Sequence, residues 1–438
     1  MFVLPKLAAL WSVLAASLVV VAVGVLLGRR SGSGLRWTPA FDVAATSFLV
    51  LNVLAMAFSI DRHQSLFGER WQYQGLLTLL LYLAFSCLAR HIISDERALT
   101  LMFAALTAGA VVVAGYALVQ HAGLDPVWRR EVPGGRVFST IGQPNALAAY
   151  LLIAVPPSTY LLRSARGALR AFVFLGTAAI VTALLLTRSR GGLAGLLVMT
   201  PLVAITLGWS GKQLWRAAAV VSLVFTVCVA IVEPVQEAVA DSWQRLALAS
   251  DRGGELSIRN HLDGWRVAAR IAADHPILGT GQETFGDVFP RYSHAVLPPE
   301  RAAYFDAFRV ESPHNIYLGI AAGAGIPALI AYVALLAGFA RVALAAATTT
   351  PQLRLGLLTI LAAVLGHLAT DAFMTPEITS SWLFWTLIGA GLGVASGARR
   401  NGAPPRRPTA VGREAPPVAV PVDPAVVAAG SPSSPPTR

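Results

Sequence analysis

Long apolar segments recur along this sequence and limit the folds that it can adopt. They run for roughly 18 residues or more and are rich in Leu, Ala, Val and Gly, which is enough for a helix to cross the ~30 Å hydrocarbon layer of a bilayer. The strands of a membrane barrel would instead be ~10 residues long with alternating polarity. Charged residues make up only 13% of the chain, about half their share in soluble domains. The sequence therefore predicts an all-α, polytopic integral membrane protein.

About eleven membrane-spanning helices are expected, or twelve if one further span exists. We place them at residues 5–27, 41–60, 75–92, 98–120, 143–162, 170–187, 191–208, 215–233, 315–340, 353–373 and 380–397. The chain then has four parts: about eight helices in 1–233, a long loop in 234–313, about three helices in 314–398, and a tail in 399–438. The tail is rich in Pro, Ala, Ser and Gly, which predicts a disordered cytoplasmic extension.

Basic residues indicate how these helices are oriented. The net charge is +11, and nearly all of the basic residues are Arg. Alternate connections, together with the tail, carry 16 Arg and Lys residues, whereas the opposite set carries 8. Because cytoplasmic connections are enriched in Arg and Lys, the first set is predicted to be cytoplasmic, with the amino terminus and the long loop outside. Nucleic-acid binding is not expected, because no basic run is interleaved with aromatic residues. Cys87 and Cys228 lie in apolar runs, so we expect packing residues and no disulfide or zinc framework.

The long loop contains eleven acidic and eight basic residues and is predicted to fold on the outer face. Within it, Leu262–Ala273 has the hydrophobic spacing of a helix that could lie along the membrane surface. Four arginines follow one another closely in the loop, and they either form a solvated helix face or include one that binds an anion: Arg252, Arg259, Arg266 and Arg270.

Arg188 and Arg190 stand in a very short outer turn, where topology does not require arginine. The guanidinium group matches phosphate oxygens with a planar fork of donors, and the helix amino terminus that follows also favours an anion. We interpret the turn as a phosphate clamp; the alternative is two arginines that reach the membrane interface.

His314 begins the helix that re-enters the membrane after the long loop. Near a helix amino terminus the cationic imidazole is disfavoured, so this histidine is a candidate base. Asn315 could bind a sugar, and Asn145, just before the fifth span, is a further candidate for which helix capping is the alternative. His367 and Asp371 share one helical face and could support the site. No metal-ligand cluster, phosphate-binding loop or dinucleotide fingerprint is recognisable, so neither a metal nor a cofactor is expected.

Taken together, the order and spacing of these motifs resemble the bacterial O-antigen ligase and polymerase superfamily over roughly residues 130–345. The motifs are Arg188-Ser189-Arg190-Gly191-Gly192, His275-Pro276-Ile277-Leu278-Gly279-Thr280-Gly281, and Pro313-His314-Asn315-Ile316-Tyr317-Leu318 with Gly325. Val137-Phe138-Ser139-Thr140, running into Pro144-Asn145, is similar to a further stretch common in this superfamily.

The resemblance implies a GT-C-type glycosyltransferase in the bacterial inner membrane, acting on the periplasmic face. Its donor would be a glycan on a polyprenyl (undecaprenyl) diphosphate, and its acceptor a hydroxyl of a lipid, a glycan or a protein. The implied catalytic residues are His314, Arg190 and Arg259, and the substrate-binding residues are Arg188, Asn315, Arg266 and Asn145. The spacing from Arg259 to Trp265 is longer than in the family pattern, so Arg252 or Arg266 could replace Arg259.

The reaction expected from these residues is metal-independent and inverts the anomeric carbon, because arginines can neutralise the leaving diphosphate while His314 takes the acceptor proton. Ligation to a lipid core and polymerisation of repeat units remain open. The main alternative is a transporter or flippase of lipid-linked or anionic solutes. Such a protein would be expected to show charges at mid-membrane depth and internal duplication.

Overall fold

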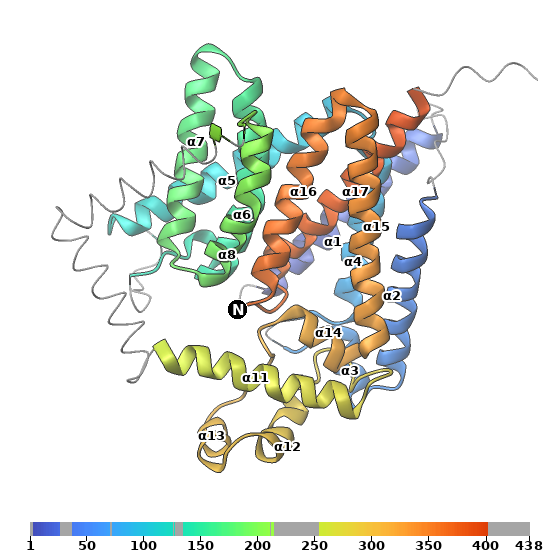
Figure 1. Ribbon diagram of the computed structural model, residues 1–438, viewed down its shortest axis with the longest axis vertical. Helices are drawn as coiled ribbons and strands as arrows, with labels where there is room; N and C mark the ends of the chain where they lie inside the picture. Colours follow the sequence, from blue (N-terminus) through green and yellow to red (C-terminus); the bar gives the residue numbers. More distant parts are fainter. Residues whose placement is uncertain are drawn as a thin grey trace, which may run out of the picture. The chain divides into compact units, whose positions relative to one another are not determined.

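The computed structural model describes residues 3–26, 37–70, 72–125, 127, 135–210, 212–213 and 254–401. Over these residues the chain is all-helical, with α-helices, one short 3-10 helix and no strand (Figure 1). Seven helices are long and apolar enough to cross a bilayer, and α1, α4 and α8 contain shorter apolar stretches. This arrangement fits a polytopic membrane protein.

With the exception of α15, the apolar helices follow the predicted spans to within a few residues. They are α1 (Val3–Leu26), α2 (Pro39–Ala57), α4 (Leu76–Ile92), α5 (Glu96–His121), α6 (Pro144–Ser164), α7 (Gly167–Leu186), α8 (Arg190–Thr206), α15 (Ile326–Thr349), α16 (Pro351–Asp371) and α17 (Ile378–Asn401). The predicted span 215–233 and nearly all of the tail lie outside the described residues.

The prediction of one helix over 315–340 is wrong. The segment forms a short helix, α14 (Ile316–Ala324), and then α15, with a break at Gly325. Gly325 has φ 88°, a left-handed value that favours glycine, and a Cβ there would collide with the carbonyl of Ile277. Hydropathy could not reveal this break, because both sides of it are apolar.

A second set of helices covers one end of the bundle. It contains α3 (Arg62–Phe67), α11 (Gly254–Asp274), α12 (Phe285–Val296), α13 (Pro299–Phe305) and α14. In Figure 1, α11 runs across the ends of the apolar helices. Its buried residues Val267 and Ile271 pack with Phe285, Phe289 and other side chains of α12–α14. The predicted amphipathic helix therefore exists, but its buried apolar face contacts the protein's own outer helices.

Small residues allow α8 and α16 to approach closely. A Cβ at Gly195 would meet the Leu152 side chain, the Gly366 carbonyl oxygen at 2.5 Å and the Thr370 hydroxyl at 2.5 Å. Thr370 donates a hydrogen bond to the Gly191 carbonyl (3.1 Å). Close backbone approach through glycine is a common way to join helices where no hydrophobic force acts between them. The crossing fixes the start of α8 against the last turn of α16.

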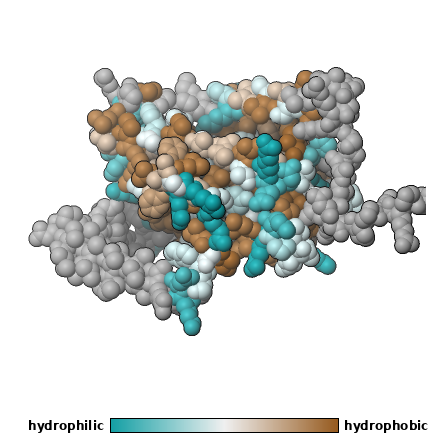
Figure 2. Space-filling view, turned by 90° about the horizontal axis from the view of Figure 1, so that it is seen from above, coloured by the Kyte–Doolittle hydropathy of each residue, from teal (hydrophilic) through white to brown (hydrophobic). Residues whose placement is uncertain are grey.

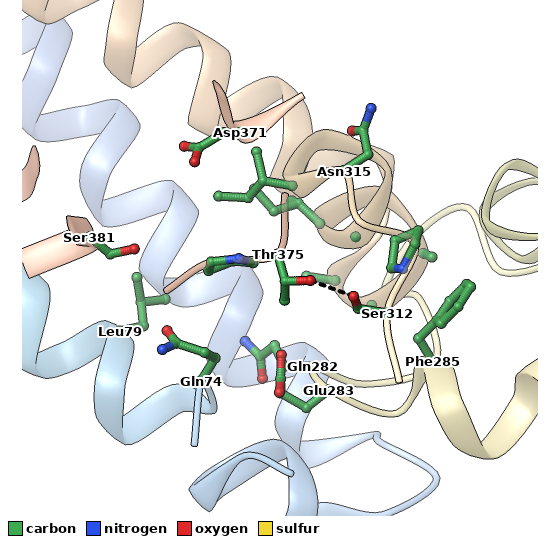
Figure 3. A pocket seen from close by; sticks show the side chains of 18 of the residues that line it. Gln74, Leu79, Gln282, Glu283, Phe285, Ser312, Asn315, Asp371, Thr375 and Ser381 are labelled. Carbon is green, nitrogen blue, oxygen red and sulfur yellow. Dashed lines mark hydrogen bonds between the residues drawn. The ribbon is translucent and has the colours of Figure 1, made fainter. Parts of the chain in front are cut away.

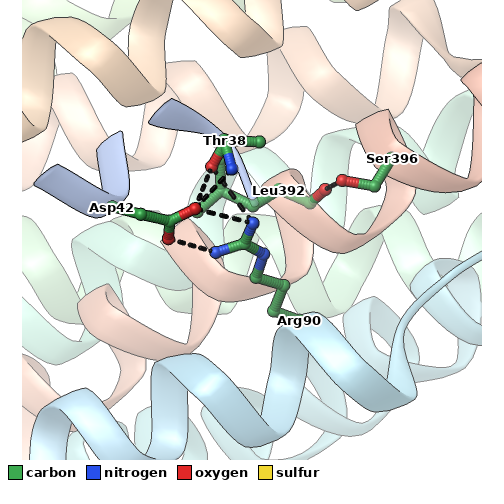
Figure 4. Close-up of polar contacts among 5 residues, drawn as sticks. All are labelled: Thr38, Asp42, Arg90, Leu392 and Ser396. Atoms are coloured by element: carbon green, nitrogen blue, oxygen red, sulfur yellow. Dashed lines mark hydrogen bonds and ion pairs between the residues drawn. The ribbon is translucent and has the colours of Figure 1, made fainter. Parts of the chain in front are cut away.

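A buried ion pair joins α2 to α4 at the other end (Figure 4). Arg90 contacts Asp42 at 2.6 Å and Thr38 at 3.1 Å, and Thr38 also donates to the Asp42 carboxylate. The Arg90 side chain is only 5% exposed. Arg90 lies near a connection that is predicted to be cytoplasmic, and its buried ion pair also gives it a role in packing α2 against α4.

The end of the bundle opposite α11 carries several exposed arginines. Seen from the end opposite α11, hydrophilic side chains gather between hydrophobic ones (Figure 2). This end carries the α6–α7 and α15–α16 connections, with exposed Arg163, Arg166 and Arg354. The start of α1 lies at the α11 end, where Lys6 donates to the Ile141 carbonyl at 2.9 Å. These arginine-bearing connections and the start of α1 therefore lie at opposite ends of the bundle.

Candidate active site

Three arginines face one cavity at the α11 end of the bundle. This arginine cavity has a volume of about 460 Å³ and is lined by Arg136, Asn145, Arg188, Ser189, Arg190, Gly191, His261, Leu262, Trp265, Phe373 and Met374. Its lining, as far as the described residues go, includes three guanidinium groups and no carboxylate. Guanidinium groups bind oxyanions through paired, charge-assisted hydrogen bonds, so the cavity suits a multiply charged anion.

The turn before α8 directs two of these arginines. Arg188 has φ 50°, and its side chain and that of Arg190 are exposed to the cavity. Ser189 caps α8 by accepting a hydrogen bond from the Gly192 N–H (3.3 Å). Because a helix amino terminus carries partial positive charge, α8 adds to the attraction for an anion.

Arg136 is the third arginine and is held by the protein. Its Nε donates to the Thr187 carbonyl (2.7 Å), and its Nη2 donates to Asn145 Oδ1 (2.6 Å). Desolvation and the charges of Arg188 and Arg190 lower the pKa of Arg136. The lowered pKa reflects the crowding of three cations at this position, which favours a bound anion.

His314 lies beside this cavity in an unusual backbone conformation, with φ 49°. Its Nδ1 is 3.2 Å from the Thr375 hydroxyl, which is 2.5 Å from the Ser312 hydroxyl, and Ser312 also accepts from the His314 N–H (3.4 Å). Desolvation by the surrounding walls, followed by the charge of His261, lowers the pKa of His314 to about 4. The ring is therefore neutral at neutral pH, although it is open to solvent.

His261 on α11 joins the two groups. Its ring meets the His314 ring edge to face, with centroids 5.3 Å apart. Desolvation and the charge of Arg190 lower the pKa of His261. On the same face of α11, Trp265 has a buried indole N–H that finds no hydrogen-bond partner among the described residues. The arginines and His314 thus lie on either side of one histidine.

The end of α16 supports both groups. The Gly191 carbonyl accepts from Thr370, as described above, and Asn315 Nδ2 donates to the Ala372 carbonyl at 3.1 Å. The segment that follows α16 also provides Thr375 against His314. Residues more than a hundred positions apart are brought together in this way.

A second cavity lies on the other side of His314 (Figure 3). We call it the carboxylate chamber, because its lining includes Glu283, Glu311 and Asp371. Gln74 and the Gln282–Glu283 turn face it from one side, and Asp371 from the other. Its further lining includes side chains that are mostly apolar, aromatic or amide: Phe48, Asn52, Leu79, Tyr82, Phe285, Tyr332, His367, Phe384 and Trp385.

The family of this fold and site follows from a comparison of the sequence with protein families. Residues 175–333 match the family model described as O-antigen ligase. This region belongs to the O-antigen ligase/polymerase superfamily. No curated protein matches the chain. The O-antigen ligase region contains Arg188, Arg190, His261 and His314, whereas Arg136 and Thr375 come from the flanking chain.

The glycine-rich motif of the O-antigen ligase region has a structural role here. Thr280 and Gly281 donate their N–H groups to the Ala322 and Gly323 carbonyls at 3.0 and 2.9 Å. Gly279 has φ 64°, and a Cβ there would collide with the Ala322 carbonyl oxygen. The motif therefore ties the outer helices to the α14–α15 break that precedes the span.

The two predicted arginines of α11 lie away from the arginine cavity. Arg266 is exposed and pairs with Asp263 at 3.1 Å, and Arg259 is also exposed; neither lines that cavity. Arg252 lies outside the described residues. The third guanidinium group of that cavity comes instead from Arg136.

Both predicted asparagines are used by the protein itself. Asn145 accepts from Arg136, and Asn315 Oδ1 caps α14 by accepting from the Leu318 N–H at 3.0 Å. Asn145 therefore positions Arg136, and Asn315 positions His314.

The sequence prediction did not include His261 and Thr375. His261 precedes Trp265 by four residues, a spacing that puts both side chains on one helical face and could have indicated it. Within the described residues, no group of three or more His, Cys, Asp or Glu side chains could hold a metal ion.

Proposed function

We propose that this chain is a membrane glycosyltransferase that moves a glycan from a polyprenyl (undecaprenyl) diphosphate to an acceptor hydroxyl, as an O-antigen ligase or a polysaccharide polymerase. The observation that carries the proposal is the arginine cavity beside a neutral histidine at one end of a helical membrane bundle. The O-antigen ligase region supports the same reaction class. We infer a GT-C-like frame of about eleven spans, in the parts given above.

The diphosphate of the donor would bind in the arginine cavity. Arg188 and Arg190 would contact its oxygens, and Arg136 would add the third charge in place of Arg259 or Arg266. Trp265 could donate its indole N–H to a bound oxygen. The polyprenyl chain would lie against the apolar helices, and the outer helices would cover the head group and exclude water.

In the transfer step, an acceptor hydroxyl attacks the anomeric carbon as the bond from that carbon to the diphosphate oxygen breaks. The departing diphosphate takes the electron pair, and the arginines stabilise its charge without requiring a metal ion. His314 takes the hydroxyl proton. A single displacement of this kind inverts the anomeric carbon.

The tautomer of His314 decides whether it can act as a base. Donation from Nδ1–H to Thr375, and from Thr375 to Ser312, leaves the lone pair of Nε2 for the acceptor proton. The Ser312 oxygen then accepts from Thr375 and from the His314 N–H. We assign Thr375 and Ser312 as positioning residues on this basis.

We place the enzyme in the bacterial inner membrane with the site on its periplasmic face. The excess of Arg and Lys in the connections at the opposite end supports this orientation.

The test uses purified full-length protein in nanodiscs with lipid-linked glycan extracted from cells that lack the gene. Transfer should continue in a chelator, and His314→Ala should lower turnover by about 10²–10⁴-fold, the usual contribution of a general base. Arg190→Ala should weaken retention of the lipid-linked glycan.

Arg166→Ala, at the opposite end of the bundle, is the matched control. Turnover of His314→Ala within about twofold of wild type would refute the base role. Translocation of the lipid-linked glycan without any new glycosidic bond would instead identify a flippase.

A further inference from the structure

Charge is segregated across His314. Among the described residues, the lining of the arginine cavity has three guanidinium groups and no carboxylate, and that of the carboxylate chamber has three carboxyl groups and no Lys or Arg. His314 lines the chamber, and its neighbour His261 lines the arginine cavity. If a reaction joins two substrates at His314, one substrate would therefore bind in the arginine cavity and the other in the carboxylate chamber, which differ in the sign of their charged groups.

The chamber is built from amide groups, carboxyl groups and aromatic side chains. Gln282 Nε2 donates to the Asn52 backbone carbonyl at 3.1 Å, and its Oε1 is buried without a partner. Tyr82 donates to Gln74 Oε1 at 2.9 Å. At the mouth, Glu311 Oε2 accepts from Gln72 at 3.2 Å. Concave sites of apolar walls with a few placed polar groups are typical of small-molecule pockets.

An unpartnered histidine points to a ligand in this chamber. His367 is 2% exposed and lines the chamber, and its Nε2 lies 3.5 Å from the Asp371 carboxylate. Its Nδ1 is buried and has no hydrogen-bond partner in the part of the chain that the structure describes. Buried polar atoms are nearly always hydrogen-bonded, so a group that binds here with a hydroxyl would satisfy this atom.

We infer that the carboxylate chamber binds the acceptor as uncharged, hydroxyl-bearing sugar residues and excludes acceptors that carry a carboxylate or a phosphate near the reacting hydroxyl. This assignment rests on the proposed function, and it names the acceptor side of that site. Amide and carboxyl groups bind sugar hydroxyls through hydrogen bonds, and the aromatic walls cover the apolar faces of a sugar ring.

The carboxyl groups make an anionic acceptor unfavourable. Desolvation is the largest of the causes that raise the pKa of Glu283 to about 7, and the charges of Glu69 and Glu311 act in the same direction. The chamber therefore disfavours negative charge even on its own carboxyl groups. One more anion would add repulsion without a cation in the lining to offset it.

The experiment compares two acceptors that differ only in charge. The glycan is released from the lipid carrier and converted to its octyl glycoside, and half of this material is oxidised at its primary hydroxyls to carboxylates. The full-length protein in nanodiscs receives the lipid-linked glycan as donor and either glycoside as acceptor. The proteins compared are wild type, Glu311→Gln and the control Glu300→Gln, an exposed carboxylate of α13 that lines neither cavity.

Wild type should use the neutral glycoside with about tenfold or greater kcat/KM than the oxidised one, as like-charge juxtaposition implies. Glu311→Gln should narrow this ratio by about threefold or more, with retention of the donor unchanged, whereas Glu300→Gln should keep it. Should Glu311→Gln fail to fold, Gln74→Glu provides the opposite test. The new carboxylate can still accept the hydrogen bond from Tyr82, and the added charge should widen the ratio of kcat/KM between the neutral and the oxidised glycoside.

Equal use of both glycosides by wild type, or a ratio that none of the chamber variants changes, would overturn the acceptor assignment and leave the proposed function intact. A Glu311→Gln protein that loses donor retention but keeps its acceptor ratio would place the chamber on the donor side, which also overturns the assignment. Use of neither glycoside would likewise overturn the acceptor assignment, whereas the proposed function itself is contradicted only if no new glycosidic bond forms in the test described for it above.

Discussion

At the scale of single residues, His314 combines a left-handed backbone with a neutral ring. Non-glycine residues adopt a φ of 49° only where neighbouring contacts over-determine the conformation, and they often do so at functional sites. Here the Ser312 and Thr375 hydroxyls fix the ring, and α14 begins two residues later. The sequence could identify the histidine from its place after the long loop. It could not identify Thr375, which is 61 residues away in the chain.

The pH dependence of transfer tests the state of this ring. A base acts only in its neutral form, and the pKa of His314 is lowered from 6.5 to about 4 by desolvation and by the charge of His261. The neutral ring therefore predominates above about pH 4, and is lost as the pH falls through that value. We expect kcat/KM for the donor, which reports the free enzyme, to be level from about pH 8 to about pH 5 and to fall below that. An acid limb near the usual 6.5 would contradict this state. The fall of kcat at acid pH should occur at a higher pH than the fall of kcat/KM, because bound diphosphate favours the imidazolium form of His314.

Removal of the Thr375 hydroxyl tests how the tautomer is set. In Thr375→Val the Nδ1 of His314 loses its partner, so less of the ring keeps its lone pair on Nε2. We expect kcat to fall about tenfold or more while KM for the donor stays within about twofold, and Thr375→Ser should restore most of kcat. Thr348→Val changes a hydroxyl that bonds only to its own helix and serves as the control. A loss that appears wholly in KM would show that Thr375 contacts the donor.

At the scale of elements, the helices were predictable and their junctions were not. Apolar runs locate α2, α5 and α16 because a bilayer imposes their length, whereas the break at Gly325 depends on a turn that begins 50 residues earlier, at His275. The same limit applies to the site. Periodicity cannot show that Arg136 reaches the α7–α8 turn, or that α11 brings His261 beside His314, because both depend on tertiary contacts.

The α8–α16 crossing offers a matched pair of glycine substitutions. In Gly195→Ala the new methyl group would overlap the Gly366 carbonyl and the Thr370 hydroxyl, so α8 must shift and Arg190 must move with it. We expect a lower melting temperature and at least about tenfold lower kcat/KM. Gly115→Ala on α5 meets no atom within 4 Å and should be neutral or stabilising by up to about 1 kcal/mol, since alanine favours a helix. Equal melting temperatures and equal activity in the two variants would show that the crossing tolerates a wider separation.

At the scale of the whole molecule, the buried Arg90–Asp42 pair secures α2, the helix that packs along α15, to α4. Removal of one member of such a pair leaves an uncompensated buried charge, which costs about 3–5 kcal/mol. Arg90→Leu should therefore lower the melting temperature of the detergent-solubilised protein strongly, and the double variant Asp42→Leu/Arg90→Leu should recover much of the loss. Arg97→Leu, exposed near the same end, is the control. A double variant no more stable than Arg90→Leu would mean that the arginine acts through packing alone.

Sidedness in the membrane is the property of the whole chain on which the site depends, because a periplasmic reaction requires α11–α13 to lie outside. Single cysteines at Ala295 on α12 and at Thr348 near the end of α15 occupy exposed positions at opposite ends of the bundle, once Cys87 and Cys228 are replaced by Ser. The positive-inside excess predicts that a membrane-impermeant maleimide labels Ala295→Cys in spheroplasts, and that it labels Thr348→Cys only after lysis. Activity of both variants is measured first, so that labelling reports a working protein. The reverse pattern would put the arginine cavity and His314 in the cytoplasm, where an outward-facing lipid-linked glycan could not reach them.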